Sequence, residues 1–320
     1  MNYITLKNTD LIVSTIALGT DVYGTALDEK TSYELLDYFT ENGGNVIDTA
    51  NIYGGWAPGG RGASEKLIGR WLKARGGRDK CIISTKGGHP VPSTMNVSRL
   101  SKKELTEDLD ESLKRLGTDY VDIYWLHRDD ESLEVQSIMD TLDGFVKEGK
   151  VRFIGMSNWS CKRIEKAQHY AEKAGKTKLV ASQIQYSVAH PNYENNDPTL
   201  VIINEDEYNY FKNHDMTVFA YASQAKGFFS KMFAGGENAL SDKARERYLN
   251  DVSIKRYKKL VEISKDTGMT VGEAAIAVLS SSCDFDTIPI VGCKNIRQLK
   301  ESMSGAGCRL TREQIEFIYE

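Results

Sequence analysis

Eight short apolar segments recur along the chain, and their regular spacing constrains the fold more than any other feature. Each is brief enough for a β-strand and too continuously apolar for a half-exposed one, which is typical of strands buried on both faces. In chain order they cover residues 16–18, 46–47, 81–84, 121–126, 153–156, 180–184, 218–221 and 287–290.

The segments between these strands have helical spacing. Apolar residues recur at intervals of three and four within 105–116, after Ser101, and within 135–146, before Gly149, a glycine suited to a helix C-cap. Strands that alternate with helices imply parallel βα units, and therefore a closed (β/α)8 TIM barrel or a doubly wound sheet. At 320 residues the chain has about 40 per unit, slightly above the barrel norm of ~250 residues in total, so the surplus predicts extra loops on a barrel.

No linker or low-complexity stretch interrupts the chain, so we expect a single domain over residues 1–320. Residues 4–6 and 11–13 flank a polar turn and predict an N-terminal β-hairpin that could plug one end of the barrel. The polar or charge-rich segments 189–199 and 226–252 predict the additional loops.

Composition narrows the classes of function. Lys and Arg total 41 against 45 Asp and Glu, a net charge of −4, so we expect neither nucleic acid nor an anionic membrane as a partner. No apolar run approaches the ~18 residues that span a bilayer, and residues 1–10 lack the pattern of a signal peptide. Five dispersed cysteines without a CxxC fit reduced thiols and predict no metal site. We therefore expect a cytoplasmic enzyme that acts on a small molecule. The sequence leaves its oligomeric state open.

Ionisable residues close three consecutive predicted strands. The second strand ends at Asp48, the third at Lys86 and the fourth at His127, while Tyr53 follows Asp48 by five residues. Catalytic residues of such barrels lie at the carboxyl ends of the strands, and neighbouring strands are ~4.8 Å apart. These four side chains can therefore meet at one rim.

The chemistry of the four residues suits proton transfer. A free Tyr titrates near ~10, which makes it a poor proton donor at neutral pH. Lys86 would lower the pKa of Tyr53, Asp48 would keep Lys86 charged, and His127 could hydrogen-bond a carbonyl oxygen. Each residue alone also fits a structural role, but four together at consecutive strand ends favour a catalytic quartet.

Several motifs resemble those of the aldo-keto reductase family, bacterial members in particular. They lie at residues 48–54, 64–69, 84–86 and 125–127, and the match extends from 17–20 to 298–301, nearly the whole chain. The resemblance implies the (β/α)8 barrel, hydride transfer with a nicotinamide cofactor, and Tyr53 as the general acid–base.

The resemblance also implies where the cofactor would lie. Ser157, Asn158 and Gln183 would hold the nicotinamide carboxamide, and Tyr221 would stack on the ring. Further expected cofactor contacts are Gly19, Thr20 and Asp21, then Ala222, Ser223, Gln224, Ala225, Lys226 and Gly227 around the pyrophosphate, and Gly292, Cys293, Lys294, Gln298 and Glu301 around the adenosine.

The adenosine segment departs from the pattern of the well-known reductases. They carry a basic residue followed by Ser or Thr, with an arginine a few residues later, where this chain has Gly292, Cys293 and Gln298. Lys294 could still neutralise a 2′-phosphate, so we expect a modest preference for NADP over NAD.

Substrate identity is the least constrained property. The resemblance places Tyr23, Trp56, Arg128 and Asp129 around the substrate, and charges beside His127 suggest a sugar or another polar carbonyl compound, although a solvated loop explains these charges equally well.

Two other functions fit the quartet. One is a cofactor-binding regulatory subunit that senses redox state, and the other is an aldolase that forms a Schiff base on Lys86. The aldolase leaves Gln183 and the 222–227 loop without a role. We therefore predict an NAD(P)-dependent oxidoreductase that interconverts an aldehyde or ketone with an alcohol.

Overall fold

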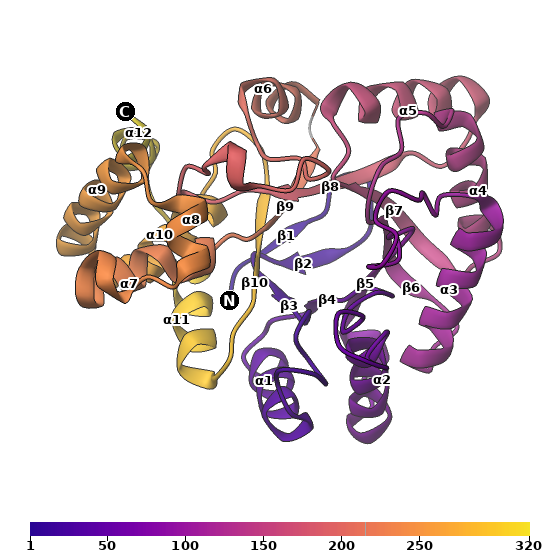
Figure 1. Cartoon of the computed structure of the whole chain (residues 1–320), viewed down its shortest axis with the longest axis horizontal. Coiled ribbons are helices and arrows are strands. Elements are labelled where there is room, and N and C mark those ends of the chain that lie inside the picture. Colours follow the sequence, from indigo (N-terminus) through magenta and orange to yellow (C-terminus); the bar gives the residue numbers. More distant parts are fainter. Residues whose placement is uncertain (215) are drawn as a thin grey trace.

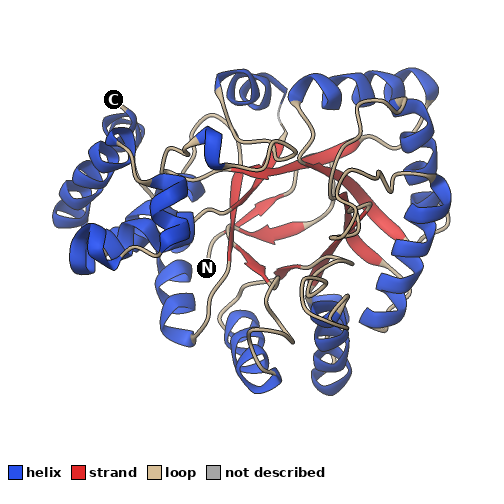
Figure 2. Cartoon of the chain, viewed as in Figure 1, coloured by secondary structure: helices blue, strands red, loops and turns tan. Residues whose placement is uncertain are grey.

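A closed barrel of eight parallel strands forms the centre of the computed structural model, which describes residues 1–214 and 216–320 (Figures 1 and 2). The strands are β3 (Ala17–Gly19), β4 (Val46–Asp48), β5 (Ile82–Gly87), β6 (Val121–Leu126), β7 (Val151–Ser157), β8 (Leu179–Gln185), β9 (Thr217–Tyr221) and β10 (Thr287–Val291). The barrel closes because β10 pairs with both β9 and β3. This confirms the predicted (β/α)8 barrel over the doubly wound sheet.

Helices surround the barrel, as Figure 2 shows in blue around the red strands. They are α1 (Glu29–Glu41), α2 (Ala63–Arg75), α3 (Lys102–Leu116), α4 (Val135–Lys147), α5 (Cys161–Ala174), α6 (Glu205–His214), α10 (Val271–Ser280) and α11 (Ile296–Gly307). The predicted helix signals are present: the Ser101 hydroxyl caps α3 by accepting from the Glu104 backbone N–H, and Gly149, with φ +74°, follows the end of α4.

The N-terminal hairpin closes one end of the barrel. Strands β1 (Tyr3–Thr5) and β2 (Ile12–Ser14) pair antiparallel, which confirms the predicted hairpin. Leu6, Leu11 and Val13 are buried in one apolar cluster with side chains from inside the barrel, such as Val46 and Ile82 near the starts of their strands. The hairpin therefore covers the end where the strands begin and leaves the carboxyl rim for a binding site.

A group of helices lies outside the barrel on one side (Figure 1). We call α7 (Phe228–Gly235), α8 (Asp242–Tyr248), α9 (Asp251–Thr267) and α12 (Arg312–Tyr319) the satellite helices. They bury their own apolar cluster, which includes Phe228, Phe229, Tyr248 and Leu260. The prediction that 226–252 is loop was therefore wrong: buried aromatic side chains give this charged segment enough apolar area to fold as helices.

The other predicted loop stays mostly irregular. Within 189–199 only the short 3-10 helix η2 (Tyr193–Asn195) is regular. The remaining 3-10 helices are η1 (Arg78–Lys80), η3 (Ala225–Gly227) and η4 (Gly236–Ala239). No helix within 1–214 or 216–320 is long and apolar enough to cross a membrane.

Candidate active site

The carboxyl ends of three neighbouring strands bring the proposed quartet together. Asp48 ends β4, Lys86 lies near the end of β5, and His127 directly follows β6. The strand register aligns Asp48 with Ser84 and Lys86 with Trp125, so the three ionisable side chains come from adjacent positions on the rim. Tyr53 reaches the same place from the turn that follows β4.

The Lys86 ammonium is the centre of this arrangement. Lys86 is 1% exposed, and its Nζ donates to Asp48 Oδ2 at 2.5 Å, to the Thr49 carbonyl at 2.8 Å and to the Tyr53 hydroxyl at 3.2 Å. These three acceptors match the three protons of an ammonium group. Burial lowers the pKa of Lys86, and the Asp48 carboxylate opposes that effect by favouring the charged form.

The Asp48 carboxylate is itself held in position. Its second oxygen, Oδ1, accepts from Ser84 Oγ at 2.6 Å and from Gln183 Nε2 at 3.1 Å. Every contact of this carboxylate is a donor, so the buried negative charge is well satisfied. Lys86 is therefore held by an ion pair with Asp48, whose own orientation is fixed by Ser84 and Gln183.

Tyr53 behaves differently from the simple expectation. Its pKa is raised well above the usual value by burial and by the carboxylate of Asp48, with Arg128 opposing. Burial and the nearby carboxylate therefore outweigh any lowering by the Lys86 ammonium, and the net shift is upward. Tyr53 consequently keeps its proton and can act as a donor.

His127 lies against Tyr53 as a neutral ring. The two ring centroids are 5.9 Å apart in an edge-to-face arrangement, and His127 is 9% exposed. Burial lowers the pKa of His127 well below its usual value, and the neighbouring His89, Arg128 and Lys86 act in the same direction. A neutral imidazole has one N–H donor and one acceptor nitrogen, which suits hydrogen bonding to a carbonyl oxygen.

His89 belongs to this rim although the sequence did not single it out. Its ring centroid is 4.7 Å from that of His127, and burial together with Arg128 lowers its pKa to about 4. The signal was its position: His89 follows Gly87 and Gly88 directly after β5, at a strand end where functional side chains gather.

The residues expected around the nicotinamide are clustered on β7, β8 and β9. Asn158 Nδ2 donates to the His127 carbonyl at 3.1 Å and to Ser157 Oγ at 3.2 Å. Its Oδ1 accepts from the Tyr221 hydroxyl at 2.7 Å. The fourth residue of this set, Gln183, contacts Asp48. These contacts link the expected nicotinamide residues directly to the quartet.

The 222–227 loop has an unusual backbone. Three residues that are not glycine have positive φ: Ala222 at 54°, Ala225 at 46° and Lys226 at 56°. Such conformations are costly and concentrate at ligand sites, where turns of this kind direct backbone N–H groups toward anions. The Ser223 hydroxyl donates to the Ile290 carbonyl at 2.6 Å, which holds the loop to β10. Because the Ser223 hydroxyl is already engaged, we expect the backbone N–H groups and Lys226 to be the groups that bind a pyrophosphate.

Side chains of this loop and of β3 are partly engaged elsewhere. Gln224 Nε2 donates to Ser302 Oγ at 2.9 Å, and the Thr20 hydroxyl donates to the Asp48 carbonyl at 2.8 Å. Asp21 is exposed and interacts electrostatically with both Lys86 and Lys226. Thr20 and Asp21, which directly follow β3, therefore connect the quartet to the proposed pyrophosphate loop.

Tight packing between β3 and β10 explains one of the two expected glycines at this seam, Gly19. A Cβ on Gly19 would lie 2.9 Å from an Ile290 methyl group, so a side chain there would push the strands apart. A Cβ on Gly292 would have open space apart from an Asp21 oxygen at 4.0 Å. Gly19 is thus required by packing, whereas Gly292 leaves room beside the rim.

The adenosine segment opens α11. Asn295 caps this helix by accepting from the Gln298 backbone N–H, and Gln298 Oε1 accepts from the Lys294 N–H at 2.8 Å. The Lys294 side chain is exposed, whereas Cys293 is 1% exposed. Burial raises the pKa of Cys293 to about 11, so its thiol belongs to the core and only its backbone can face a cofactor. Glu301 accepts from Thr270 Oγ1 at 2.8 Å.

The four residues expected around the substrate separate into two groups. The Trp56 ring is 55% exposed and lies 6.1 Å from the Tyr53 ring, and Arg128 interacts electrostatically with Tyr53. Tyr23, by contrast, is fully buried. Trp56 and Arg128 are therefore the members of this group that face the rim beside Tyr53.

The fourth member, Asp129, is engaged in an ion pair. Its carboxylate lies 3.1 Å from Arg163 Nε, and both side chains are largely buried. Arg128 has no carboxylate within 4 Å among the described residues, and its Nη1 donates only to the His127 carbonyl, at 3.0 Å. Among the described residues, Asp129 therefore forms an ion pair, whereas Arg128 forms none and interacts electrostatically with Asp197. No group of three potential metal ligands occurs in the part of the chain that the structure describes.

Comparison with known proteins gives a consistent result. The model of the "Aldo/keto reductase family" matches residues 15–320. A curated relative, the "Uncharacterized oxidoreductase YrpG" of Bacillus subtilis, is 30% identical, and the alignment covers 99% of this chain and 95% of that protein. "Protein tas" of Escherichia coli is 27% identical, with 100% and 98% covered. The "Aryl-alcohol dehydrogenase [NADP(+)]" of Phanerodontia chrysosporium is 26% identical, with 91% and 76% covered.

A solved structure supports the fold. The thermostable aldo-keto reductase Tm1743, determined with the inhibitor epalrestat, superimposes with a TM-score of 0.72 at 24% identity. The match covers 100% of this chain and 99% of that one.

Proposed function

Because this chain belongs to the aldo/keto reductase family, we propose that it is an NAD(P)-dependent oxidoreductase that interconverts an aldehyde or ketone with an alcohol. The observation that carries the proposal is the Lys86 ammonium, which lies between Asp48 and the Tyr53 hydroxyl beside a neutral His127. The assignment of Tyr53 as general acid–base rests on this geometry.

In the reducing direction, the His127 imidazole donates a hydrogen bond to the carbonyl oxygen and orients it toward Tyr53. The nicotinamide, when bound, supplies the hydride that adds to the carbonyl carbon. Tyr53 gives its hydroxyl proton to the oxygen, and Lys86 stabilises the negative charge left on the phenolate. Asp48 keeps Lys86 charged and aimed, and Tyr53 is later reprotonated from solvent. Oxidation of an alcohol follows the same steps in reverse.

The cofactor fits residues that the chain already places together. Ser157, Asn158 and Gln183 provide hydrogen-bonding groups for a carboxamide, and Tyr221 provides a flat ring beside them. The positive-φ backbone of 222–227 suits an anion such as pyrophosphate. We propose that the remaining expected contacts complete this extended site.

NADP is the proposed cofactor, with a modest preference over NAD. The exposed Lys294 at the start of α11 is a cation available to a 2′-phosphate. A relative named as an NADP(+)-dependent dehydrogenase supports the same choice.

The proposed substrate is a polar carbonyl compound, for example a sugar. Support comes from Arg128, a guanidinium beside Tyr53 with no carboxylate within 4 Å among the described residues, because its donors favour a hydroxylated or anionic substrate. Asp129 contributes indirectly, since its pairing with Arg163 holds the loop that carries Arg128.

The aldolase alternative is disfavoured by the state of Lys86. Schiff-base formation needs a neutral amine with access to a carbonyl carbon, whereas this ammonium donates to three acceptors and is paired with Asp48. Trapping with borohydride would label Lys86 only if a Schiff base forms.

A turnover screen tests the proposal. Purified protein is incubated with NADPH or NADH and a panel of aldehydes, ketones and sugars, and loss of the near-ultraviolet absorbance of the reduced nicotinamide is followed. We expect carbonyl-dependent oxidation of the cofactor. Tight cofactor binding without turnover on any carbonyl would instead favour the redox-sensing regulatory subunit.

A further inference from the structure

A second cavity lies away from the catalytic quartet, between the barrel and the satellite helices. Its volume is about 540 Å³, within the range of small-molecule sites. It is enclosed by the segment after β8, the start of α6, and helices α9 and α12. We call it the outer cavity. Among the described residues, its lining includes none of the quartet.

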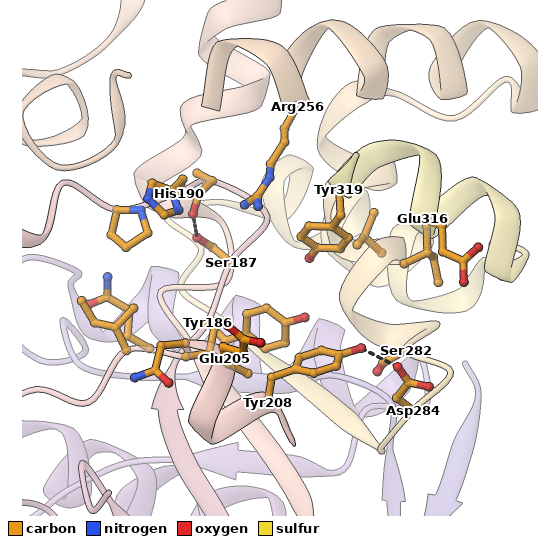
Figure 3. A pocket seen from close by; sticks show the side chains of 18 of the residues that line it. Tyr186, Ser187, His190, Glu205, Tyr208, Arg256, Ser282, Asp284, Glu316 and Tyr319 are labelled. Atoms are coloured by element: carbon orange, nitrogen blue, oxygen red, sulfur yellow. Dashed lines mark hydrogen bonds between the residues drawn. The ribbon is translucent and has the colours of Figure 1, made fainter. Parts of the chain in front are cut away.

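Aromatic side chains form the two facing walls of the outer cavity. Figure 3 shows Tyr186 and Tyr208 on the barrel side and Tyr319 opposite them, with Arg256 beside Tyr319. Aliphatic residues such as Ile203 complete the lining. Facing aromatic walls favour a flat ring, because ring surfaces gain from stacked or edge-to-face contact.

Asp284 is the acidic residue of the lining that pairs closely with cations. Asp284 accepts from the Tyr208 hydroxyl at 2.6 Å and pairs with Arg312 at 3.2 Å and Lys212 at 3.3 Å. Glu205 and Glu316 also line the cavity but are exposed to solvent.

Arg256, in contrast to Asp284, does not form an ion pair with a described residue. Within 1–214 and 216–320 it has no carboxylate within 4 Å, and its Nη1 donates to the Val188 carbonyl at 2.9 Å. Its guanidinium lies 4.7 Å from the centre of the Tyr319 ring, and its buried Nε has no hydrogen-bond partner among the described residues. The neighbouring His190 adds no second positive charge, because burial and Arg256 both lower its pKa. One end of the cavity therefore carries an unbalanced positive charge.

We propose that the outer cavity is a second ligand site, for a flat aromatic carboxylate, with the ring against the tyrosine side chains of the lining and the carboxylate on Arg256. A planar guanidinium matches the two oxygens of a carboxylate, and stacking on Tyr319 presets its plane. The site is adjacent to the catalytic rim, since the Tyr186 N–H donates to the Tyr221 carbonyl at 3.1 Å.

Isothermal titration calorimetry with naphthoate tests the charge requirement. The wild-type chain is titrated with and without saturating NADPH, and the matched neutral probe is naphthamide. We expect naphthoate to bind in both conditions and at least about tenfold more tightly than naphthamide, because only the acid engages Arg256. Binding that disappears when NADPH is present would place the probe in the catalytic cleft and overturn the proposal.

Arg256→Gln should weaken naphthoate at least about tenfold and leave naphthamide within about twofold. Arg245→Gln, on α8 and outside the cavity lining, is the matched control and should bind naphthoate like the wild type. Equal naphthoate affinity in Arg256→Gln and the wild type would overturn the proposal. Thermal unfolding of both variants separates a folding defect from loss of the site.

The exposed thiol of Cys283 gives a readout that needs no variant. Cys283 lines the outer cavity, whereas Cys308, in the satellite cluster, does not. We expect naphthoate to slow the reaction of Cys283 with N-ethylmaleimide, measured peptide by peptide, and to leave Cys308 unchanged. Unchanged reactivity of Cys283 at saturating naphthoate would place the probe elsewhere and overturn the proposal.

Discussion

Lys86 Nζ lies 2.5 Å from Asp48 Oδ2, and neither residue is more than 1% exposed. This one ion pair serves two purposes. It satisfies two buried charges that would each be costly alone, and it aims the ammonium at the Tyr53 hydroxyl. Stability and the proposed chemistry are therefore coupled at this position, and the variants below separate them.

Tyr53→Phe should lower kcat at least about 100-fold, because it removes the proposed proton donor. The only hydrogen bond of the Tyr53 hydroxyl to a described residue is the one from Lys86, so cofactor affinity should be unchanged. Steady-state kinetics and a fluorescence titration with NADPH measure the two quantities. Parallel losses of turnover and cofactor affinity would mean that Tyr53 has a structural role.

Lys86→Met should move the pH profile of alcohol oxidation upward. Oxidation needs the Tyr53 phenolate as a base, and without the ammonium the pKa of Tyr53 rises further, so a higher pH is needed to form the phenolate. The substitution also leaves Asp48 buried and unpaired, at a cost of about 3–5 kcal/mol.

The Lys86→Met/Asp48→Asn double variant is the control, since it removes both charges. It should recover stability in a denaturant titration. Because Asp48 itself raises the pKa of Tyr53, the double variant reports on stability only. An unchanged pH profile in a Lys86→Met variant that still folds would take Lys86 out of the mechanism.

Lys294→Ala should weaken NADPH about 10- to 100-fold relative to NADH, if Lys294 contacts the 2′-phosphate. Gln298 should matter less, because its amide already accepts from the Lys294 N–H and carries no charge. Paired fluorescence titrations at fixed salt measure both affinities. Equal loss of affinity for NADPH and NADH in this variant would contradict the NADP assignment and would not bear on the proposed role of the quartet.

Arg128→Gln should raise KM for carboxybenzaldehyde about tenfold or more and leave KM for benzaldehyde nearly unchanged. Within 1–214 and 216–320, the guanidinium beside Tyr53 has no carboxylate within 4 Å, so an anionic substrate gains a charge-assisted hydrogen bond there. Steady-state kinetics on both aldehydes give the ratio. Equal changes in KM for the two aldehydes would show that Arg128 does not recognise charge.

Gly155→Ala should destabilise the barrel by about 1–3 kcal/mol, because the strand has no room for a methyl group. A Cβ on Gly155 would lie 2.9 Å from the Ala181 carbonyl oxygen and closer still to the Trp125 ring. Gly144→Ala is the matched control: nothing lies within 4 Å of its Cβ, and α4 should gain about 0.5–1 kcal/mol. Denaturant unfolding of both variants should give opposite signs.

The barrel could be predicted because its signal is local. Each strand contains a short apolar run, and Asp48, Lys86 and His127 stand at or next to the ends of β4, β5 and β6. The same reasoning did not find α7 and α8, since Phe228 and Phe229 are surrounded by glycines and charged residues that lower the average hydrophobicity of the segment.

Properties that depend on distant partners were beyond sequence reasoning. Asp129 pairs with Arg163, a residue 34 positions away, and nothing local indicates that contact. The direction of the Tyr53 pKa shift depends on how deeply the phenol is buried, which outweighs the nearby ammonium. The outer cavity is likewise created by the packing of α9 and α12 on the barrel.

The pairing of β3 with β10 has a consequence for how the chain is made. The partner edge of β3 does not exist until residues 287–291 have been synthesised, on the order of 10–50 s after β3 itself at ~5–20 residues per second. During that interval the nascent chain holds an open sheet whose first edge is unprotected and prone to pairing with other strands. A substitution that slows the emergence of β10 is therefore expected to lower the yield of folded protein without changing any contact of the folded structure.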